Sequence, residues 1–281
     1  MEKFPITIVV PVSNDERIGV CIDSVDEDVE IVVVLNNNPS KAVQDIVRHS
    51  RRCKIITIDE AGCNLAKVFN EGIKSATNEK ILLMNSDCTF QPGLIREVNW
   101  LLDIHDVVKA RVVFDYKNYS HYLVAQCRYL FHHVFDGGKN LYGPGLSFKK
   151  SISSMVGGYF FDERMGWGED GEFSNRIISS PLNILILEKN IFHGEEGIVH
   201  DLKVAFKIGK GSGIKNREKG LSRTQALVAD MGHVLTDHRK QFRLAYIHGG
   251  PILLIYFLLW KLVFHAGFYE EMLKRRSVNG G

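Results

Sequence analysis

Short apolar runs alternate with amphipathic stretches through the first hundred residues of the chain. The runs are rich in Val, Ile and Leu and predict strands at 6–12, 30–35, 54–58 and 80–84. Apolar residues with helical spacing predict helices between them, at 17–25, 41–49 and 65–76. This alternation predicts an α/β fold with a mostly parallel sheet flanked by helices, and the continuous apolar runs predict strands covered on both faces.

Short polar segments follow three of these runs: 11–14, 36–38 and 85–87. Because ligands of open parallel sheets bind beyond the carboxyl ends of the strands, these segments predict the rim of a binding site. The first strand is not followed by G-x-G-x-x-G, and G-x-x-x-x-G-K-[ST] is also absent. The sequence therefore disfavours a dinucleotide-dependent oxidoreductase and a P-loop kinase.

The pattern changes after residue 107. A further apolar strand at 107–114 precedes an aromatic and basic stretch at 116–133, which predicts a packed amphipathic helix or, alternatively, a surface that faces lipid or acceptor. Another strand is predicted at 183–187. Residues 207–217 combine glycines with cations, have no apolar pattern, and predict a flexible basic loop. An apolar run at 251–260 is interrupted by Lys261 and His265 before it reaches the roughly 20 residues of a membrane span. It predicts an interfacial anchor at 250–268, or a helix that binds a partner.

Charge is distributed unevenly along the 281 residues. The net charge is only +2, but residues 203–281 carry 14 basic and 5 acidic side chains. This asymmetry predicts an anionic partner, either a phosphate-bearing ligand or an acidic membrane surface. Nucleic acid is not predicted, because the cations are interleaved with apolar runs. Five cysteines without a C-x-x-C pair indicate a reducing compartment, and the N-terminus has no signal-peptide pattern.

Two segments contain residues suited to catalysis. Asn85 and Asp87 follow a buried strand and are suited to bind a hard divalent cation, although Asn-Ser-Asp is also a good turn sequence. The segment 156–176 places Trp167 between two glycines and then the acids Glu169 and Asp170 at the start of a predicted helix. The structural alternative is a negatively charged helix N-terminus, with a Glu172–Arg176 pair in the next turns.

The order and spacing of these motifs resemble the family 2 inverting glycosyltransferases with the GT-A fold. The resemblance covers roughly residues 5–200. Its motifs are ITIVVPVSN, VVVLNNNPS, the helix that reaches Asn70-Glu71-Gly72, LLMNSD and GGYFFDERMGWGEDGEFSNR. Two departures from the family pattern are Asn-Asn-Asn at a position that is usually acidic and Asn85 in place of an Asp. They leave the nucleotide base open and weaken the metal motif.

The resemblance implies a role for individual residues. The nucleotide-sugar would be held by Pro11, Val12, Asn14, Asn37, Asn38, Asn70, Ser86 and Asp87. A divalent cation, Mn²⁺ or Mg²⁺, would be bound by Asp87, Asn85 and His193. Asp170 would be the catalytic base and Glu169 would contact donor sugar or acceptor, with Gly157, Gly158 and Trp167 on the acceptor side.

We therefore expect a glycosyltransferase domain at 1–202, with a nucleotide-sugar half to about 115 and an acceptor half from about 116. The enzyme (EC 2.4) would move a sugar with inversion from a nucleotide diphosphate to a saccharide or lipid-linked acceptor, in cell-surface polysaccharide synthesis. It would be cytoplasmic, bound peripherally to the inner face of the membrane, and an oligomer is possible. The basic residues Lys207, Lys210, Lys215 and Arg217 would form a lid over the diphosphate, or alternatively a solvated linker. A non-catalytic module that binds sugar nucleotides or glycans is the alternative function.

Overall fold

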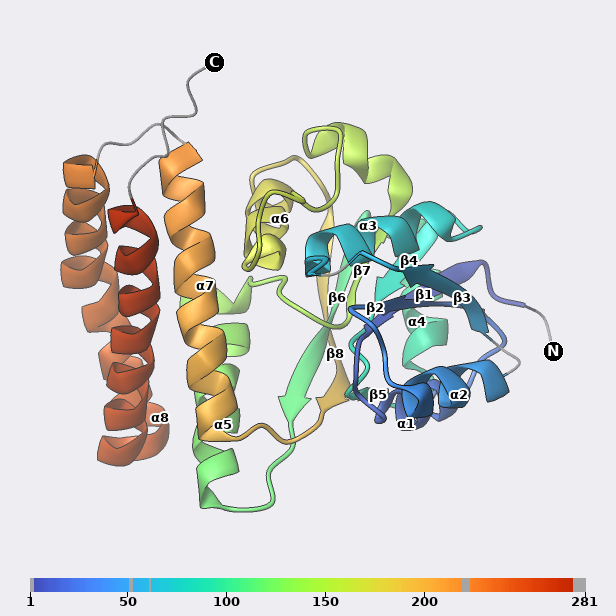
Figure 1. Cartoon of the computed structure of the whole chain (residues 1–281), viewed down its shortest axis with the longest axis horizontal. Helices are drawn as coiled ribbons and strands as arrows, with labels where there is room; N and C mark the ends of the chain where they lie inside the picture. Colours follow the sequence, from blue (N-terminus) through green and yellow to red (C-terminus); the bar gives the residue numbers. More distant parts are fainter. Residues whose placement is uncertain (1–2, 51–52, 61, 219–222, 275–281) are drawn as a thin grey trace. The chain divides into compact units, whose positions relative to one another are not determined.

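The computed structural model describes residues 3–50, 53–60, 62–218 and 223–274 (Figure 1). Its contacts divide the chain into two compact units. The first comprises the chain up to Asp115 together with Phe131–Glu195, and the second comprises Tyr116–Leu130 together with the chain from Glu196 onward. The second unit therefore includes residues 116–130 and 196–202, which the sequence analysis places in the domain at 1–202.

The described part of the first unit is built on a sheet of eight strands in the order β3-β2-β1-β4-β7-β6-β8-β5. The strands are β1 (Ile6–Val12), β2 (Glu30–Asn36), β3 (Cys53–Ile58), β4 (Lys80–Leu83), β5 (Cys88–Phe90), β6 (Val107–Phe114), β7 (Leu146–Lys149) and β8 (Ile184–His193). Strands β1 to β4 pair with one another in parallel, and β6 is parallel to β8. Strand β7 runs antiparallel to both β4 and β6, and β5 runs antiparallel to β8.

These directions bring several loops to one edge of the sheet. Strands β1, β2, β4, β6 and β8 all end at this edge, which we call the carboxyl edge. Because β7 and β5 run the other way, they begin there. Segments that end a strand and segments that begin one therefore meet at the carboxyl edge, although they lie far apart in the sequence.

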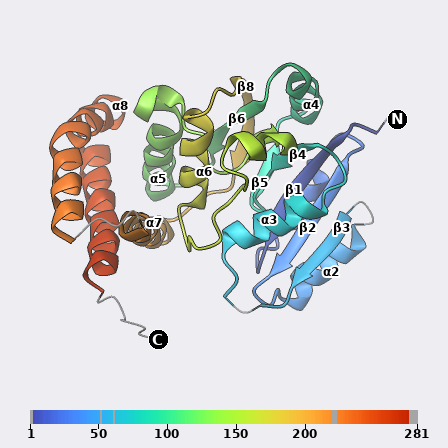
Figure 2. The ribbon, with the colours of Figure 1, turned by 90° about the horizontal axis from the view of Figure 1, so that it is seen from above.

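Helices cover both faces of the sheet (Figure 2). One apolar core packs the sheet against α1 (Ile18–Asp23), α2 (Lys41–His49) and α4 (Leu94–Ile104). The other core packs the opposite face against α3 (Leu65–Ser75) and α6 (Glu169–Ile178). Side chains at the helix starts supply missing hydrogen-bond acceptors: Ser40 accepts from the backbone of Val43, and Asn64 accepts from that of Lys67.

The sequence-based fold class, a mostly parallel sheet flanked by helices, is confirmed. Predicted strands and helices begin and end within a few residues of the observed ones, and only the strand predicted at 183–187 is much longer, because it continues to His193. The expectation that every strand is covered on both faces is wrong for β3. This strand lies at the end of the sheet, and Ile55 is 37% exposed.

The second unit is helical, with α5 (Tyr119–Tyr129), α7 (Ile198–Glu218) and α8 (Arg223–Leu273). Helix α8 is broken at Gly249 and Gly250, and Gly250 has the left-handed φ of 69° that favours glycine. The two limbs of α8 fold back on each other, and the rings of Phe242 and Phe257, at similar distances before and after the break, have centroids 5.8 Å apart (Figure 1).

The prediction of a flexible basic loop at 207–217 is wrong. These residues lie in α7, so Lys207, Lys210, Lys215 and Arg217 are helical residues and not members of a mobile segment. The glycines interpreted as flexible are packing positions. A Cβ atom at Gly209 would lie 1.9 Å from the carbonyl oxygen of Phe264, and one at Gly267 would lie 2.1 Å from that of Phe206. The backbones of α7 and α8 therefore come into contact, which is possible because Gly209 and Gly267 have no side chains.

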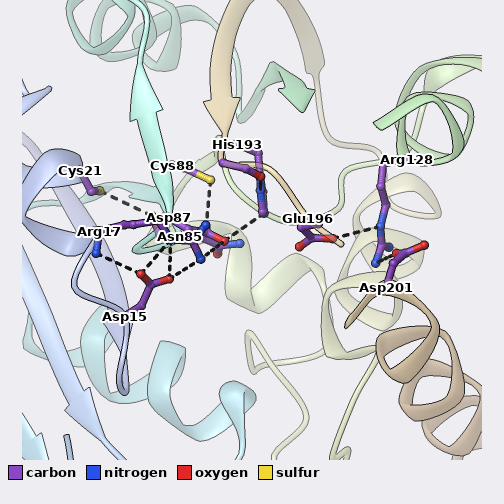
Figure 3. A network of polar contacts seen from close by, with 11 residues as sticks. Asp15, Arg17, Cys21, Asn85, Asp87, Cys88, Arg128, His193, Glu196 and Asp201 are labelled. Carbon is purple, nitrogen blue, oxygen red and sulfur yellow. Dashed lines mark hydrogen bonds and ion pairs between the residues drawn. The ribbon is translucent and has the colours of Figure 1, made fainter. Parts of the chain in front are cut away.

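A buried polar cluster joins the three helices of this unit, and Figure 3 shows its residues Arg128, Glu196 and Asp201. Nη2 of Arg128 in α5 forms an ion pair with Oδ1 of Asp201 in α7 at 2.5 Å, and the hydroxyl of Tyr256 in α8 donates to Oδ2 at 2.5 Å. Glu196 lies 3.8 Å from Arg128 Nε. Because Asp201 is fully buried, these partners are what makes its charge tolerable in the helical core.

The end of α8 combines length with apolar character. Arg239–Leu273 has a mean hydropathy of 1.7 over its most apolar window, and within the described residues it is the one helix long and apolar enough to cross a membrane. The limb after the break is roughly 34 Å long at about 1.5 Å per residue. One face of this limb is exposed and apolar, and it consists of Ile252, Ile255, Leu258, Leu259 and Leu262. Leu253, Phe257 and Trp260 on the other face are buried.

Candidate active site

The loops after β1 and β2 are fastened to each other at the carboxyl edge. Asn14 accepts a hydrogen bond from the backbone N–H of Ser40 through Oδ1, at 2.7 Å. The amide of the buried Asn36 donates to the carbonyl oxygen of Val12 at 3.0 Å. Asn37 and Asn38 have left-handed φ values of 53° and 54°, which asparagine tolerates better than most residues. The residues predicted to bind the nucleotide, Pro11, Val12, Asn14, Asn37 and Asn38, thus form one rigid rim.

Asp87 and His193 meet at the same edge. Asp87 follows β4, and His193 ends β8. Oδ2 of Asp87 lies 3.5 Å from Nε2 of His193 (Figure 3). The antiparallel pairing of β5 with β8 places Cys88 directly opposite His193, and the Cys88 thiol donates to Oδ1 of Asp87 at 3.5 Å.

These side chains fit a divalent cation. The oxygen, sulfur and nitrogen ligand atoms of Asp87, Cys88 and His193 all lie within 4.8 Å of one another. The Nδ1 atom of His193 is 2.9 Å from the carbonyl oxygen of Gly194, which can only accept, so Nδ1 carries a proton and Nε2 is the ring nitrogen that faces Asp87. The ring is held by stacking on Phe114, with centroids 4.6 Å apart. A backbone carbonyl that fixes the tautomer in this way is typical of metal-binding histidines.

Two residues missed in the sequence analysis lie beside Asp87. The guanidinium of Arg17 binds both carboxylate oxygens of Asp15 and also lies 3.5 Å from Oδ2 of Asp87. Burial raises the pKa of Asp15, but the hydrogen bonds from Arg17 outweigh it and hold this pKa below its ordinary value. A fixed cation therefore faces the predicted diphosphate position. The signal in the sequence was an acid and a base two residues apart, immediately after the first rim segment.

The contacts of Asn85 and Ser86 leave their predicted roles open. The backbone carbonyl of Asn85 accepts hydrogen bonds from the Cys21 thiol and from the backbone N–H of Cys88. Ser86 is partly exposed in the same turn. Both residues thus lie next to Asp87, and metal or nucleotide binding by their side chains stays a prediction.

The acidic pair begins α6, after Gly168 with its left-handed φ of 81°. Asp170 accepts from the backbone N–H of Gly171 through Oδ1 at 2.7 Å and from that of Gly143 through Oδ2 at 3.2 Å. Glu169 is only 4% exposed, and burial together with the neighbouring charge of Asp170 raises the pKa of Glu169 to about 8. At neutral pH one acid of the pair therefore keeps its proton.

Asp170 is connected to the carboxyl edge through the backbone. Its partner Gly143 lies two residues before Gly145, whose N–H donates to the carbonyl oxygen of Leu83 at the end of β4. Asp87 follows the same strand. Asp170 and Asp87 are therefore both anchored where β4 ends, and that they face each other across one cleft stays a prediction.

The predicted acceptor residues lie in the segment that precedes α6. Gly157 and Gly158 have left-handed φ values of 101° and 84°, and Trp167 is 37% exposed. Arg176 donates to the carbonyl oxygens of Val156, Tyr159 and Phe160 and fixes the glycine loop. The predicted Glu172–Arg176 ion pair is confirmed, at 2.8 Å. The loop is thus a rigid platform with an aromatic face.

Asn70 has a structural role in addition to any role with the nucleotide. Its amide nitrogen donates to the carbonyl oxygen of Phe161 and to Oε1 of Glu163, and its amide oxygen accepts from the N–H of Phe161. These contacts fasten α3 to the segment that leads to the acidic pair. Nucleotide binding by Asn70 stays a prediction.

The sheet and its carboxyl edge define a nucleotide-sugar transferase of the GT-A type. A carboxylate and a histidine meet where β4 and β8 end, and Asp170 of the acidic pair is anchored to the same edge. A family profile described as Glycosyl transferase family 2 matches residues 7–155, which is more than half of the chain. The chain belongs to this family. The match ends before Glu169 and Asp170.

Solved structures support the fold. The chain is similar to a crystal structure of S. aureus TarS residues 1–349, at 16% identity and a TM-score of 0.54. The similarity covers 95% of this chain and 88% of the TarS chain. A complex of the same protein with UDP has a TM-score of 0.53 at 16% identity and the same coverage, and one with UDP-GlcNAc has 0.53 at 15% identity, covering 95% of this chain and 89% of that one. Against a longer TarS chain, the similarity covers 73% of this chain and 39% of that one. The comparison with curated proteins gives no match.

Proposed function

We propose that this glycosyltransferase transfers a sugar with inversion from a nucleotide diphosphate to a hydroxyl acceptor, with Asp170 as the base. An inverting displacement needs one base for the acceptor hydroxyl and positive charge for the departing diphosphate. The carboxylate of Asp170, held by two backbone N–H groups, supplies the base. The observation that carries the proposal is the anchoring of this carboxylate to the edge where Asp87 and His193 meet.

We propose that Asp87, Cys88 and His193 hold a divalent cation on the diphosphate. The cation would supply positive charge to the departing phosphate oxygens. Arg17, fixed by Asp15, adds a permanent cation beside it. UDP and UDP-GlcNAc are the first donors to test, because the similar TarS protein binds both.

The experiment replaces Asp170 with Asn and measures transfer and nucleotide binding separately. The amide cannot accept the proton, so transfer falls on the order of 100-fold or more while the affinity for UDP, measured by calorimetry, stays within a few-fold. Asp23→Asn is the matched control, because Asp23 is an exposed aspartate of α1. Undiminished transfer by Asp170→Asn refutes the assignment. UDP binding without transfer to any acceptor favours the alternative, a non-catalytic sugar-nucleotide or glycan-binding module.

We further propose that the second unit binds the inner face of the membrane and that the acceptor is lipid-linked, as in cell-surface polysaccharide synthesis. The exposed apolar face of α8 is suited to the acyl boundary of a bilayer. Lys203 and Lys207, one turn apart on α7, are exposed in the same unit and suit anionic headgroups.

The test uses Ile255→Glu with Leu262→Glu, because both side chains are exposed and their replacement leaves the core unchanged. We expect the wild type to sediment with phosphatidylglycerol-containing vesicles and the double variant to stay in the supernatant. Ile104→Glu, at an exposed isoleucine of the first unit, is the control and keeps sedimenting. Equal sedimentation of the double variant and the wild type contradicts the proposal.

A further inference from the structure

Lys109 is a lysine in the middle of the sheet. It lies in β6, is 3% exposed, and is flanked by the buried residues Val108 and Ala110. Burial lowers the pKa of Lys109 to about 7, against opposing effects of the Cys88 and Asp170 charges. Because an amine in an apolar core destabilises the fold unless its N–H groups are bound, its partners identify its role.

The amino group of Lys109 binds the loop that begins β7. It donates to the carbonyl oxygen of Pro144 at 2.7 Å and to that of Ala110 at 2.9 Å. Pro144 lies between Gly143 and Gly145, which have left-handed φ values of 61° and 81°. Gly145 donates to Leu83 in β4 and accepts from Ala110 in β6. The loop is therefore bound to β4 and β6 through the backbone of Gly145, and to β6 also through the amino group of Lys109.

The other side of this loop holds the proposed base. The N–H of Gly143 donates to Oδ2 of Asp170 at 3.2 Å. Side chain and loop thus form a continuous chain of hydrogen bonds and peptide bonds from Lys109 through Pro144 and Gly143 to the carboxylate. The charge of Asp170 also acts on Lys109, as the upward contribution of Asp170 to the lysine pKa shows.

We propose that Lys109 is a positioning residue for Asp170, which it orients through the loop of Gly143 and Pro144. This inference rests on the proposed function, since it requires that Asp170 act on the acceptor. Lys109 has no contact with substrate in this assignment. Without its amino group the Pro144 carbonyl loses its hydrogen bond, and the N–H that orients the carboxylate loses its support.

The test is a double-mutant cycle of Lys109→Met with Asp170→Asn, together with pH profiles. We expect Lys109→Met to lower kcat on the order of 10- to 100-fold, because small displacements of a catalytic group have effects of this size, with the donor KM within a few-fold. In the Asp170→Asn background the same replacement has no further effect on the residual kcat. The acidic limb of the kcat/KM profile moves to higher pH, because Asp170 has lost a neighbouring cation and still faces Glu169.

Lys80→Met is the matched control. Lys80 is another buried lysine of the same sheet, in β4, whose amino group donates to the carbonyl oxygen of Asn99 and pairs with Asp103. We expect its replacement to lower the melting temperature and leave the pH profile of transfer unchanged. A purely structural role for Lys109 predicts the same behaviour for Lys109→Met.

The outcomes separate this inference from the proposed function. An unchanged kcat and pH profile in Lys109→Met overturns the inference, and so do multiplicative losses of kcat in the double variant. If Lys109→Met does not fold, Lys109→Gln, which keeps a donor for Pro144, enters the same cycle. If the wild type transfers no sugar, or if Asp170→Asn retains full activity, the proposed function fails instead. An unmeasurable residual kcat in Asp170→Asn leaves the decision to the pH profiles.

Discussion

Replacing Glu169 with Gln tests the electrostatics of the acidic pair through protein stability. The folded protein holds Glu169 with a pKa of about 8, and the ordinary value is 4.5. Below pH 4.5 the carboxyl group is protonated in both states, and its ionisation contributes nothing to the free energy of unfolding. Between the two values the unfolded chain releases a proton that the folded protein keeps, so stability falls as pH rises.

The interval between the two pKa values of Glu169 sets how much stability is lost. Each pH unit in this interval lowers the free energy of unfolding by about 1.4 kcal/mol. By pH 8 the total decrease is therefore about 5 kcal/mol. This is a large part of the roughly 5–15 kcal/mol that stabilises a typical domain. Glutamine resembles the protonated carboxyl group in shape and does not ionise. The variant therefore escapes the loss, and its advantage over the wild type grows with pH.

The assay is urea unfolding at pH 5, 6, 7 and 8, with the free energy of unfolding compared at each pH. We expect a difference between Glu169→Gln and the wild type that increases steadily across this range. Glu188→Gln is the control, because Glu188 is an exposed glutamate on β8, and its difference from the wild type stays flat. A difference for Glu169→Gln that does not depend on pH refutes the reasoning, since Glu169 would then ionise like an exposed side chain.

Three further variants test other contacts. Gly209→Ala places a Cβ atom against the Phe264 carbonyl and lowers the melting temperature, whereas Gly197→Ala, where a Cβ atom would meet nothing within 4 Å, leaves it within a degree or two. Asp201→Asn leaves Arg128 without its buried counter-charge and lowers the free energy of unfolding by about 3 kcal/mol, measured in urea with Asp23→Asn, at an exposed aspartate of α1, as the control. His193→Ala lowers Mn²⁺ affinity on the order of 10-fold or more in equilibrium dialysis, and the exposed His200→Ala does not; equal affinities would contradict the cation site.

The sequence predicted those parts of the fold that depend on local pattern. Continuous Val and Ile runs located the strands, and the polar segments after them located the rim, because both follow from the geometry of a parallel sheet. Asp87 and His193 were assigned by resemblance, and the structure brings them together. Their convergence depends on the pairing of β5 with β8, which no local pattern specifies.

The failures have physical causes that act over long distances. The glycines near Gly209 indicated flexibility, but tertiary packing against the Phe264 carbonyl overrode their weak helix propensity. Lys109 was hidden inside a run interpreted as an apolar strand. A lysine in such a run was a usable signal, because buried lysines need specific partners. Cys88 contributed to the sequence analysis only as one of five cysteines without a C-x-x-C pair, and its position opposite His193 could not be seen along the chain.

The antiparallel course of β7 has a consequence for engineering new specificity. Because β7 begins where β1, β2 and β4 end, the peptide that holds Asp170 enters the edge from a different part of the chain than the peptides predicted to hold the nucleotide. Tyr142, which is partly exposed in the loop that begins β7, can therefore be substituted to vary what is glycosylated while the predicted donor residues are left unchanged. Such variants would treat the two substrates of the enzyme as independent design variables.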